Sequence, residues 1–581
     1  MDPITIPTGA FRLDGGIVAH RDHLNTENLM KTIDPHQFAA IYAEEHDGWF
    51  AEPEFAGQYV DALVQHYRRS GDDDFLDRAR VVIDSILTNQ REDGYLGTYR
   101  RGLEFDETFS VWNQAFTIKG MVSYYEATGD ARVLAAAQKC ADYVANGFLA
   151  PDGPELLRTL NQGLQHSSIL QQMVRLYRVT EKQLYLHFAN YIIRRWEETT
   201  IRFITGPNEY SSPLLMMGAL KAIESLVCYQ GIVELYEVTG TDRYLSAAER
   251  YWELLRREQI NIVGCGSITE LWVLGGNRPA NLPIDVHPNE TCVAWGWARF
   301  SMMLFRLTGR GRYLDAVEET YYNHILGAQA ADGTDFSYYQ GLVGRKVHQL
   351  RPGQYSCCRY RGLHYLSYLP DHVVAYDSRR LFVNIYASGS ATLEEAGASV
   401  RIDTDYPRSG RITITLGIAK ERTFTLMLRV PAWCASYRTR VDGEELPVPP
   451  EGLTEGYLGI ERSWSAGNHT IDLELEMTVR VRRANVDHRD SVGISYGPLT
   501  LAIDSTHGTP IHATEVALAG DTVGLEPLDT GADEHLPIVS FRTRGAIDGK
   551  PSDVTLVDYA SAGSAHPNHD EFKVWLPIIG G

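Results

Sequence analysis

Three of the chain's seven cysteines stand close to a carboxylate in two short segments. Residues 289–292 contain a Glu-x-Cys pair, and residues 355–358 end in two adjacent cysteines. Zinc in proteins takes thiolate sulfur and carboxylate oxygen in a tetrahedral shell. The ligands would be Glu290, Cys292, Cys357 and Cys358. Free cysteine is also a common core residue, and this spacing matches no standard zinc ribbon. The residues alone therefore leave a metal site and three buried core cysteines both open.

The composition limits the classes of function. Lys and Arg number 54 against 75 Asp and Glu, and the net charge of −21 opposes binding to nucleic acid or an anionic membrane. No apolar run approaches the roughly 20 residues of a membrane span, and Met1–His23 lacks the apolar core of a signal peptide. Sparse, odd-numbered cysteines are typical of reduced cytosolic thiols. We therefore expect a cytoplasmic protein without nucleic-acid or membrane partners.

The elements that position these residues begin with a repeat. From Phe55 to Leu326 an aromatic residue, then Thr-Gly or a variant, then an amphipathic stretch recur, with the Ser or Thr at positions 70, 128, 180, 239 and 308. This period fits a pair of helices, the first of which ends at a left-handed glycine. In the second copy Cys140 falls on the apolar stripe, which predicts a core residue. A degenerate sixth copy over Tyr355–Tyr376 gives about six helical hairpins.

Six hairpins could form an open superhelix with a concave groove or close into an (α/α)6 barrel with a deep funnel. Long loops rich in Gly, Pro and Trp, such as Val263–Asn289, favour the barrel because active-site loops have this character. Near Asp377 the period changes to the alternation typical of antiparallel β-sandwiches. We expect an N-terminal segment over 1–20 that adds a strand to a β domain, the barrel over 21–376, a β-sandwich over 377–504 and a smaller β domain over 505–581.

Several phrases, taken in order, resemble glycoside hydrolase family 127, whose known members include non-reducing-end β-L-arabinofuranosidases. The phrases are Asp93–Thr98, Tyr125–Asp130, Glu290–Cys292, Asp315–Glu318 with Tyr322–Asn323, Cys357–Cys358, Gly456–Tyr457 with Ile460–Trp464, and Tyr496–Leu499. The family fold is an (α/α)6 barrel followed by β-sandwiches, which is the fold class that the periodicity favours. The resemblance therefore covers most of the chain.

The resemblance implies a Zn²⁺ ion held by the four ligands above, with Cys357 as the nucleophile. A free thiol with a pKa near 8.5 is mostly protonated at neutral pH, whereas zinc coordination keeps it a thiolate. Usual retaining glycosidases attack with a carboxylate. Here Cys357 would form a thioglycosyl intermediate that water hydrolyses. Glu270 matches the family's acid/base, with Asp285 as a competitor and a solvated loop carboxylate as the other interpretation.

Further residues match or depart from the family's sugar contacts. His166, Glu318 and Tyr338 resemble substrate-binding residues, although a structural histidine, a helix-surface glutamate and a core tyrosine look the same in sequence. Lys119 stands where the arabinofuranosidases carry a sugar-contacting histidine; it could pair with an acidic sugar or point to solvent. Two further departures are Gly218, in a region that lacks an expected histidine, and Tyr355, where some members have a cysteine. Candidate stacking platforms are Trp49, Trp272, Trp295 and Trp297, with core packing the favoured interpretation for at least two of them.

These observations favour a zinc-dependent, retaining exo-glycoside hydrolase that releases a terminal β-L-arabinofuranose or related sugar from an oligosaccharide or glycoside. Two other functions stay open. One is an α/α-barrel glycosidase or lyase of different sugar specificity with a structural zinc, and the other is a carbohydrate-binding protein without catalysis. The sequence leaves the exact sugar open, together with a homodimeric state.

Overall fold

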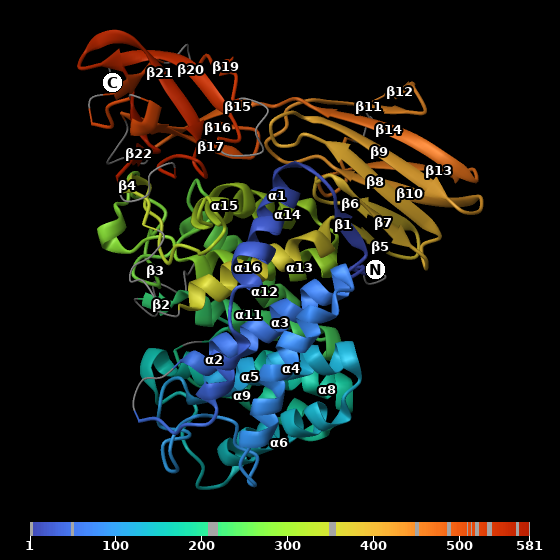
Figure 1. Ribbon diagram of the computed structural model, residues 1–581, viewed down its shortest axis with the longest axis vertical. Coiled ribbons are helices and arrows are strands. Elements are labelled where there is room, and N and C mark those ends of the chain that lie inside the picture. The colour runs from blue at the N-terminus through green and yellow to red at the C-terminus, as the bar shows by residue number, and fades with distance from the viewer. Residues whose placement is uncertain are drawn as a thin grey trace.

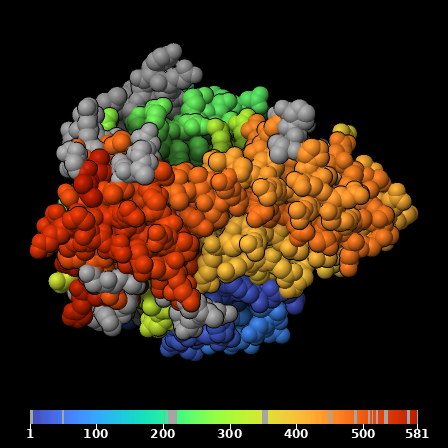
Figure 2. Space-filling view, turned by 90° about the horizontal axis from the view of Figure 1, so that it is seen from above, coloured from blue at the N-terminus to red at the C-terminus, as the bar shows by residue number. Residues whose placement is uncertain are grey.

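The computed structural model describes residues 4–47, 51–200, 202–206, 219–347, 356–447, 452–484, 490–507, 509–512, 514–517, 522–530, 537–564 and 569–579. A helical unit forms one end of the molecule, and two β units lie side by side at its other end (Figures 1 and 2). Mixed α plus β architecture with antiparallel sheets is therefore confirmed.

Helices of the N-terminal unit form two layers. The inner layer consists of Glu52–Ser70 (α3), Ser110–Thr128 (α5), Leu170–Thr180 (α8), Ala222–Thr239 (α11), Thr291–Thr308 (α13) and Cys357–Tyr368 (α16). These contact one another in that order, and α16 contacts α3, which closes a ring. The outer layer consists of Asp73–Asn89 (α4), Ala131–Leu149 (α6), Gln183–Glu197 (α9), Asp242–Glu258 (α12) and Gly311–Glu319 (α14), each packed on the inner helix before it.

Burial separates the two layers. Helix α5 is buried without interruption from Ser110 to Tyr124, because other helices surround it. Helix α4 buries a single stripe that includes Phe75, Val82 and Ile86, which is the pattern of a helix with one face on the core. Cys140 of α6 is fully buried, as predicted.

The predicted helix–glycine–helix junctions are confirmed. Gly71, Gly129, Gly240 and Gly309 follow the inner helices with φ of 71°, 72°, 63° and 70°, and Glu181 takes the same place with φ of 56°. Each of these residues donates its N–H to the carbonyl of an aromatic residue four positions earlier. The recurring aromatic and Thr-Gly or its variant therefore mark where five of the six inner helices end, whereas α16 continues into the short helix Leu369–His372 (η5).

Shorter elements complete this unit. The helices are Gly16–Leu24 (α1), Asn25–Met30 (η1), Pro35–Ile41 (α2), Leu160–Gly163 (η2), Leu164–Ser167 (α7), Ile284–Val286 (η3), Thr320–Ile325 (η4), Leu326–Ala328 (α15) and Leu369–His372 (η5). The strands are Ala219–Lys221 (β2), Leu271–Val273 (β3) and Val343–Arg345 (β4). Strands β2 and β3 pair antiparallel and bring two loops together beside the site described below.

The middle unit consists of a seven-stranded and a four-stranded sheet. The first has the order β1-β7-β8-β9-β14-β11-β12, with Phe11–Leu13 (β1), Gly389–Leu393 (β7), Ala398–Thr404 (β8), Arg411–Ile418 (β9), Gly467–Leu475 (β14), Tyr437–Val441 (β11) and Glu444–Leu446 (β12). The second has the order β13-β10-β6-β5, with Tyr457–Trp464 (β13), Arg422–Arg429 (β10), Arg380–Val383 (β6) and Val374–Tyr376 (β5). Strand β1 is the N-terminal strand that the sequence led us to expect, and it pairs with β7.

A ten-stranded sheet forms the C-terminal unit. Its strands are Val479–Arg483 (β15), Ser491–Tyr496 (β16), Leu499–Asp504 (β17), Thr514–Val516 (β18), Glu526–Leu528 (β19), Ser540–Ile547 (β20), Lys550–Asp558 (β21), Glu571–Lys573 (β22) and Leu576–Pro577 (β23), together with β4 of the helical unit. A short helix, Ser505–His507 (η7), follows β17.

Strand pairing corrects the expected boundary after residue 504. Strand β15 pairs with β16, β16 with β17, and β17 with β21, so residues 479–504 belong to the C-terminal sheet. An alternating pattern predicts that a segment is a strand, but the partner that it pairs with, and hence its sheet, depends on distant residues.

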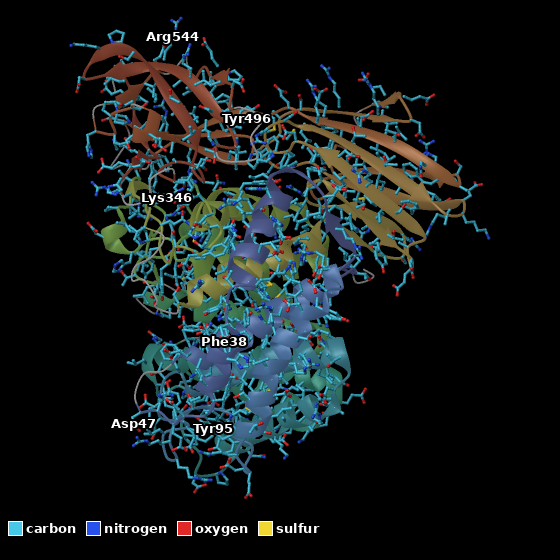
Figure 3. The ribbon with its side chains drawn as sticks, in the orientation of Figure 1. Phe38, Asp47, Tyr95, Lys346, Tyr496 and Arg544 are labelled. Carbon is cyan, nitrogen blue, oxygen red and sulfur yellow. The ribbon has the colours of Figure 1, made fainter. Side chains whose placement is uncertain are left out.

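The C-terminal unit is fastened to the helical unit. Strand β4 pairs with β22, and the buried ammonium of Lys346, labelled in Figure 3, donates to the carbonyls of Tyr559 and Ala560 at 2.8 and 2.7 Å. Because an unpaired buried ammonium is costly, these bonds fix the loop after β4 on the sheet. Among the described residues, no helix is long and apolar enough to cross a membrane.

Candidate active site

A cavity of about 600 Å³ lies where the first turns of the inner helices meet. Glu54 of α3, Trp112 of α5, Glu224 of α11, Glu290 at the N-cap of α13 and Cys357 at the start of α16 all line it. The N-terminus of a helix carries a partial positive charge, which favours carboxylates and thiolates. The ring therefore builds a pocket of small-molecule size that holds several acidic groups.

Four side chains at one end of the cavity form a cluster suited to a metal ion. One ligand atom from each of Glu290, Cys292, Cys357 and Cys358 lies within 4.8 Å of the others. The Cys358 sulfur is 3.3 Å from the Cys292 sulfur and 3.8 Å from Oε1 of Glu290. The other carboxylate oxygen, Oε2 of Glu290, is buried and has no hydrogen-bond partner in the described chain. A buried carboxylate oxygen without a donor calls for a cation or a ligand.

The electrostatics of the cluster agree with that reading. Burial raises the pKa of Glu290, Cys292 and Cys358 well above the usual values, because the charged forms lose their hydration. The pKa of Cys357 moves the opposite way, since the thiols of Cys292 and Cys358 donate hydrogen bonds to its sulfur. Three sulfurs and one carboxylate fit zinc, whose charge would compensate the crowded anions.

Glu270 faces the same cavity and is held by three donors. The hydroxyls of Tyr338 and Tyr339 donate to its Oε1 at 2.7 and 2.6 Å, and the ammonium of Lys221 forms an ion pair with its Oε2. Burial alone would raise the pKa of Glu270, but Lys221 and then the two hydroxyls favour the charged form, and the net pKa lies below the usual range. Glu270 is therefore a fixed carboxylate beside a cation.

Backbone geometry explains why Glu270 points into the cavity. The pairing of β2 with β3 sets Lys221 beside the Glu270 segment. Ser267, Thr269 and Glu270 have φ of 81°, 50° and 64°, a region that residues with a side chain seldom occupy and that is least favourable for a β-branched threonine. The Thr269 N–H donates to the carbonyl of His287 at 2.9 Å, which holds this strained loop in place.

Tyr338 connects the two ends of the site. Its hydroxyl oxygen is 3.7 Å from the Cys357 sulfur and 2.7 Å from Oε1 of Glu270. The Cys357 sulfur and Oε1 of Glu270 therefore lie no farther apart than the sum of these two distances. That range includes the spacing of about 5 Å between the two groups of a retaining glycosidase.

The two adjacent cysteines differ in exposure. Cys357 is half-buried and lines the cavity, whereas Cys358 is fully buried behind it. Cys357 is the first residue of α16, whose N-cap Ser356 accepts the Arg359 N–H at 3.3 Å. A thiol at a helix N-terminus is stabilised as the thiolate. Of the three clustered sulfurs, that of Cys357 is therefore the one that faces a ligand in the cavity and could act as a nucleophile.

Two of the predicted sugar contacts lie outside the cavity lining. Lys119 is only 2% exposed and pairs with Asp61 at 2.7 Å, so it meets neither an acidic sugar nor solvent. His166 is fully buried, and its Nε2 lies 3.0 Å from the carbonyl of Glu107, a residue that does line the cavity. Both face the packed core of the ring, which a helix position in a sequence does not reveal.

Glu318 lies at the contact between α14 and the middle β unit. Its Oε1 accepts from Tyr406 at 2.6 Å and forms an ion pair with Arg429, and its Oε2 accepts from Trp433 at 3.0 Å. The structure does not bring it to the cavity, because β-unit residues cover the helix face that the sequence presents as an acidic surface. Glu318 fastens the two units together.

Replacing Glu318 by alanine is expected to destabilise the protein by about 3–5 kcal/mol, because Arg429 is fully buried and loses its principal partner. Calorimetry would measure this loss as a lower Tm. Its neighbour Glu319, partly exposed and paired with Arg256, is the matched control, with an effect of about 1 kcal/mol or less when changed to alanine. A higher KM for the substrate in Glu318→Ala, at unchanged Tm, would instead support Glu318 as a sugar contact.

The remaining candidates are placed as follows. Trp272, Trp295 and Trp297 are buried in the core, so they present no stacking face. Asp285 is exposed and outside the cavity lining, so of the two acid/base candidates from the sequence Glu270 alone faces the cavity. Trp49, Gly218 and Tyr355 lie outside the described residues.

Several lining residues were not found from the sequence. They are Glu54, Gln165, Lys221 and Glu224. Glu54 accepts from Trp112 at 2.5 Å and from Arg361 at 2.9 Å. Glu54, Lys221 and Glu224 occupy the first turn or cap of an inner helix, and Gln165 lies on the short helix α7 just before α8. The starts of these repeats were therefore the signal that could have identified them.

Comparisons with known proteins show the family of the chain. The family model described as β-L-arabinofuranosidase, GH127 catalytic domain, matches residues 16–371, and that of the GH127 middle domain matches residues 380–477. The non-reducing end β-L-arabinofuranosidase of Bifidobacterium longum subsp. longum is 22% identical over 551 residues, which cover 83% of this chain and 82% of that protein.

Two solved structures share the fold along almost the whole chain. A GH127 β-arabinofuranosidase has a TM-score of 0.83 at 21% identity, covering 99% of this chain and 98% of its own. A GH127 β-L-arabinofuranosidase from Geobacillus stearothermophilus T6 has a TM-score of 0.80 at 19% identity, covering 98% and 100%.

The family that these models describe is one of glycoside hydrolases, and this protein is an enzyme of that class. The catalytic-domain match spans more than half of the chain. The chain therefore belongs to glycoside hydrolase family 127, as the motifs of its sequence suggest.

Proposed function

We propose that this enzyme releases a terminal β-L-arabinofuranose, or a closely related sugar, from the non-reducing end of a glycoside with retention of configuration. The observation that carries the proposal is the apposition of Cys357 and Glu270 across one tyrosine hydroxyl in a cavity. A nucleophile and a proton donor at this spacing are what a retaining mechanism requires. The activity named for the Bifidobacterium longum relative supports the choice of sugar.

The fold proposed for this activity is an (α/α)6 barrel over about residues 16–371, followed by a β-sandwich to about residue 477 and a C-terminal β unit. The closed order of contacts among the six inner helices supports the barrel. The proposed site residues are Cys357 and Glu270 for catalysis, Tyr338 for substrate binding, and Glu290, Cys292, Cys357 and Cys358 for Zn²⁺.

In the first proposed step, the Cys357 thiolate attacks the anomeric carbon. A carbon–sulfur bond forms as the bond to the leaving oxygen breaks, and Glu270, which must be protonated for this step, gives its proton to that oxygen. Tyr338 and Tyr339 hold Oε1 of Glu270 in place throughout. The products of this step are the free aglycone and a thioglycosyl enzyme.

In the second step, water replaces the sulfur. Glu270, now a carboxylate, takes a proton from the water, whose oxygen bonds to the anomeric carbon as the carbon–sulfur bond breaks. The Cys357 thiolate is restored and the second inversion returns the original configuration. The ion pair with Lys221 favours Glu270 in the charged form that this step needs.

Bound zinc would keep the cysteines deprotonated and hold the Cys357 sulfur toward the cavity. We expect one zinc per chain by elemental analysis, and a Cys292→Ser variant with much weaker zinc retention, because one of four ligands is lost. Cys265→Ser is the control, since this buried cysteine is not part of the cluster. Stoichiometric zinc in both variants would exclude Cys292 as a ligand.

A screen of nitrophenyl glycosides that includes both arabinofuranoside anomers tests the function. We expect hydrolysis of the β-L-arabinofuranoside, with β-L-arabinofuranose as the first product seen by proton NMR before mutarotation. An inverted product would contradict the mechanism, and an unsaturated sugar absorbing in the ultraviolet would instead make the protein a lyase.

The proposed setting is the cytoplasm, with a carbohydrate as the partner. The seven cysteines are all free of disulfides, which is consistent with a reducing compartment. A homodimer stays a prediction, and sedimentation of the purified protein would test it.

A further inference from the structure

Two buried side chains in the cavity carry acceptor oxygens without a donor. Gln165 of α7 is fully buried and Glu224 of α11 is 2% exposed, and both line the cavity. The Gln165 amide donates to Oε1 of Glu224 at 3.1 Å. Oε1 of Gln165 and Oε2 of Glu224 have no hydrogen-bond partner within the described chain. The pair is thus internally joined and has two acceptors left over.

Such a pair lowers the stability of the fold unless a hydrogen-bond donor satisfies its two free acceptors. A buried acceptor without a donor forfeits its hydration, and the cost is greater for a carboxylate than for an amide. Burial raises the pKa of Glu224 to about 7, which reflects the same loss. Core packing needs no such pair, and apolar residues of the same shape would fill the space at less cost. The two free acceptors therefore indicate a ligand that supplies donors.

The surroundings restrict the chemistry of that ligand. Glu54, Glu270 and Glu290 also line the cavity, and Lys221, the one lysine of the lining that the structure describes, is paired with Glu270. A sugar carboxylate would be repelled by these groups and would find no free cation among the described lining residues. Hydroxyl groups are neutral and donate hydrogen bonds, so they satisfy the acceptors without adding charge.

We propose that Glu224 and Gln165 bind two neighbouring hydroxyl groups of the terminal sugar and thereby select its configuration. This inference rests on the proposed function, because it assigns the substrate of the same site. The hydrogen bond between the two side chains holds their free acceptor oxygens close together. The two oxygens can therefore accept hydrogen bonds from adjacent hydroxyl groups of one sugar ring. Lys221, three residues before Glu224, reaches Glu270, so the same turn of α11 touches both the proton donor and the sugar.

Calorimetric binding tests the pair without turnover. Free L-arabinose and its 2-deoxy and 3-deoxy forms are titrated into the full-length protein and into Glu224→Gln, which keeps the shape but replaces the free acceptor with a donor. We expect Glu224→Gln to weaken L-arabinose binding by about 10- to 100-fold. For the deoxy sugar that lacks the contacted hydroxyl, the same change costs little, because the interaction is already absent. Equal losses for all three sugars would overturn the proposal and make Glu224 a structural residue.

Two further variants secure the result. Gln165→Met removes the other acceptor and should show the same pattern with the other deoxy sugar. Glu253→Gln, on the outer helix α12 and outside the cavity, should leave binding unchanged. If no glycoside is hydrolysed but the deoxy pattern appears, the proposed function fails while this inference stands. If β-L-arabinofuranosides are hydrolysed and the deoxy pattern is missing, this inference fails alone.

Discussion

Cys357→Ser should lower kcat/KM for a β-L-arabinofuranoside by about 10⁴-fold or more, because the hydroxyl of serine is far less ionised than a thiol at a helix N-terminus. The measurement is the initial rate of nitrophenol release at substrate concentrations well below KM, together with the zinc content and Tm of the variant. Zinc analysis is needed because Cys357 is also one of the four clustered ligands. A variant that retains zinc and Tm but not activity has lost the nucleophile alone.

The control for this substitution is Cys434→Ser. Cys434 is half-buried like Cys357 but lies in the middle β unit, and its replacement should leave kcat/KM within about twofold, as surface changes usually do. A second measurement is intact-protein mass spectrometry after rapid quenching. A pentosyl adduct on the peptide that contains Cys357 would identify the covalent intermediate. Activity of Cys357→Ser near that of the unchanged chain would end the cysteine mechanism.

The helical part of the fold was predictable because its signals are local. Gly129 ends α5 after an aromatic residue whose carbonyl it bonds, and the same geometry returns after α3, α8, α11 and α13. Even Glu181, which breaks the glycine rule, takes the left-handed conformation at the expected position. Closure of the ring depends on contacts between α16 and α3, far apart in sequence, and no local pattern contains that information.

The cluster of one glutamate and three cysteines drew attention for a different reason, since cysteine is rare and three cysteines near a glutamate stand out. The residues alone left a metal site and buried core cysteines both open, and it was the family resemblance that implied the metal. Lys221 and Glu224 did not stand out, because lysine and glutamate are common on helices. Lys221 meets Glu270 only through the pairing of β2 with β3, across 49 residues of chain. Lys221 and Glu224 could thus not be recognised from the sequence, because their residue types are common on helices.

Glu318 shows the limit of reading a helix by itself. In sequence its neighbours Asp315 and Glu319 make it part of an acidic face. In the fold Arg429 arrives from the middle β unit and turns that face into a buried contact. Lys119 is a second example, inside the ring of helices, where it forms an ion pair with Asp61 of α3. The environment of a charged helix residue is decided by the element that covers it.

Glu270→Gln should lower kcat/KM by about 10²- to 10⁴-fold for a disaccharide, whose leaving oxygen needs a proton, and far less for a nitrophenyl glycoside, whose leaving group departs unprotonated. Asp285→Asn is the control, and it should leave both substrates unaffected because Asp285 is exposed and outside the cavity lining. Equal losses of Glu270→Gln on both substrates would contradict the role of proton donor, and the same leaving-group dependence in Asp285→Asn would transfer the role to that residue.

The pH profile gives Glu270 a second signature. Lys221 and the two tyrosine hydroxyls outweigh burial and hold the pKa of Glu270 below its usual range, so the protonated form needed in the first step is lost as pH rises through that pKa. Disaccharide hydrolysis by the unchanged chain should therefore fall on the alkaline side, and Glu270→Gln should lack this limb. Azide needs no base to attack the thioglycosyl enzyme, so it should restore kcat of Glu270→Gln on the nitrophenyl glycoside and yield the β-glycosyl azide. An α-azide would mean a single displacement and would remove the covalent intermediate from the mechanism.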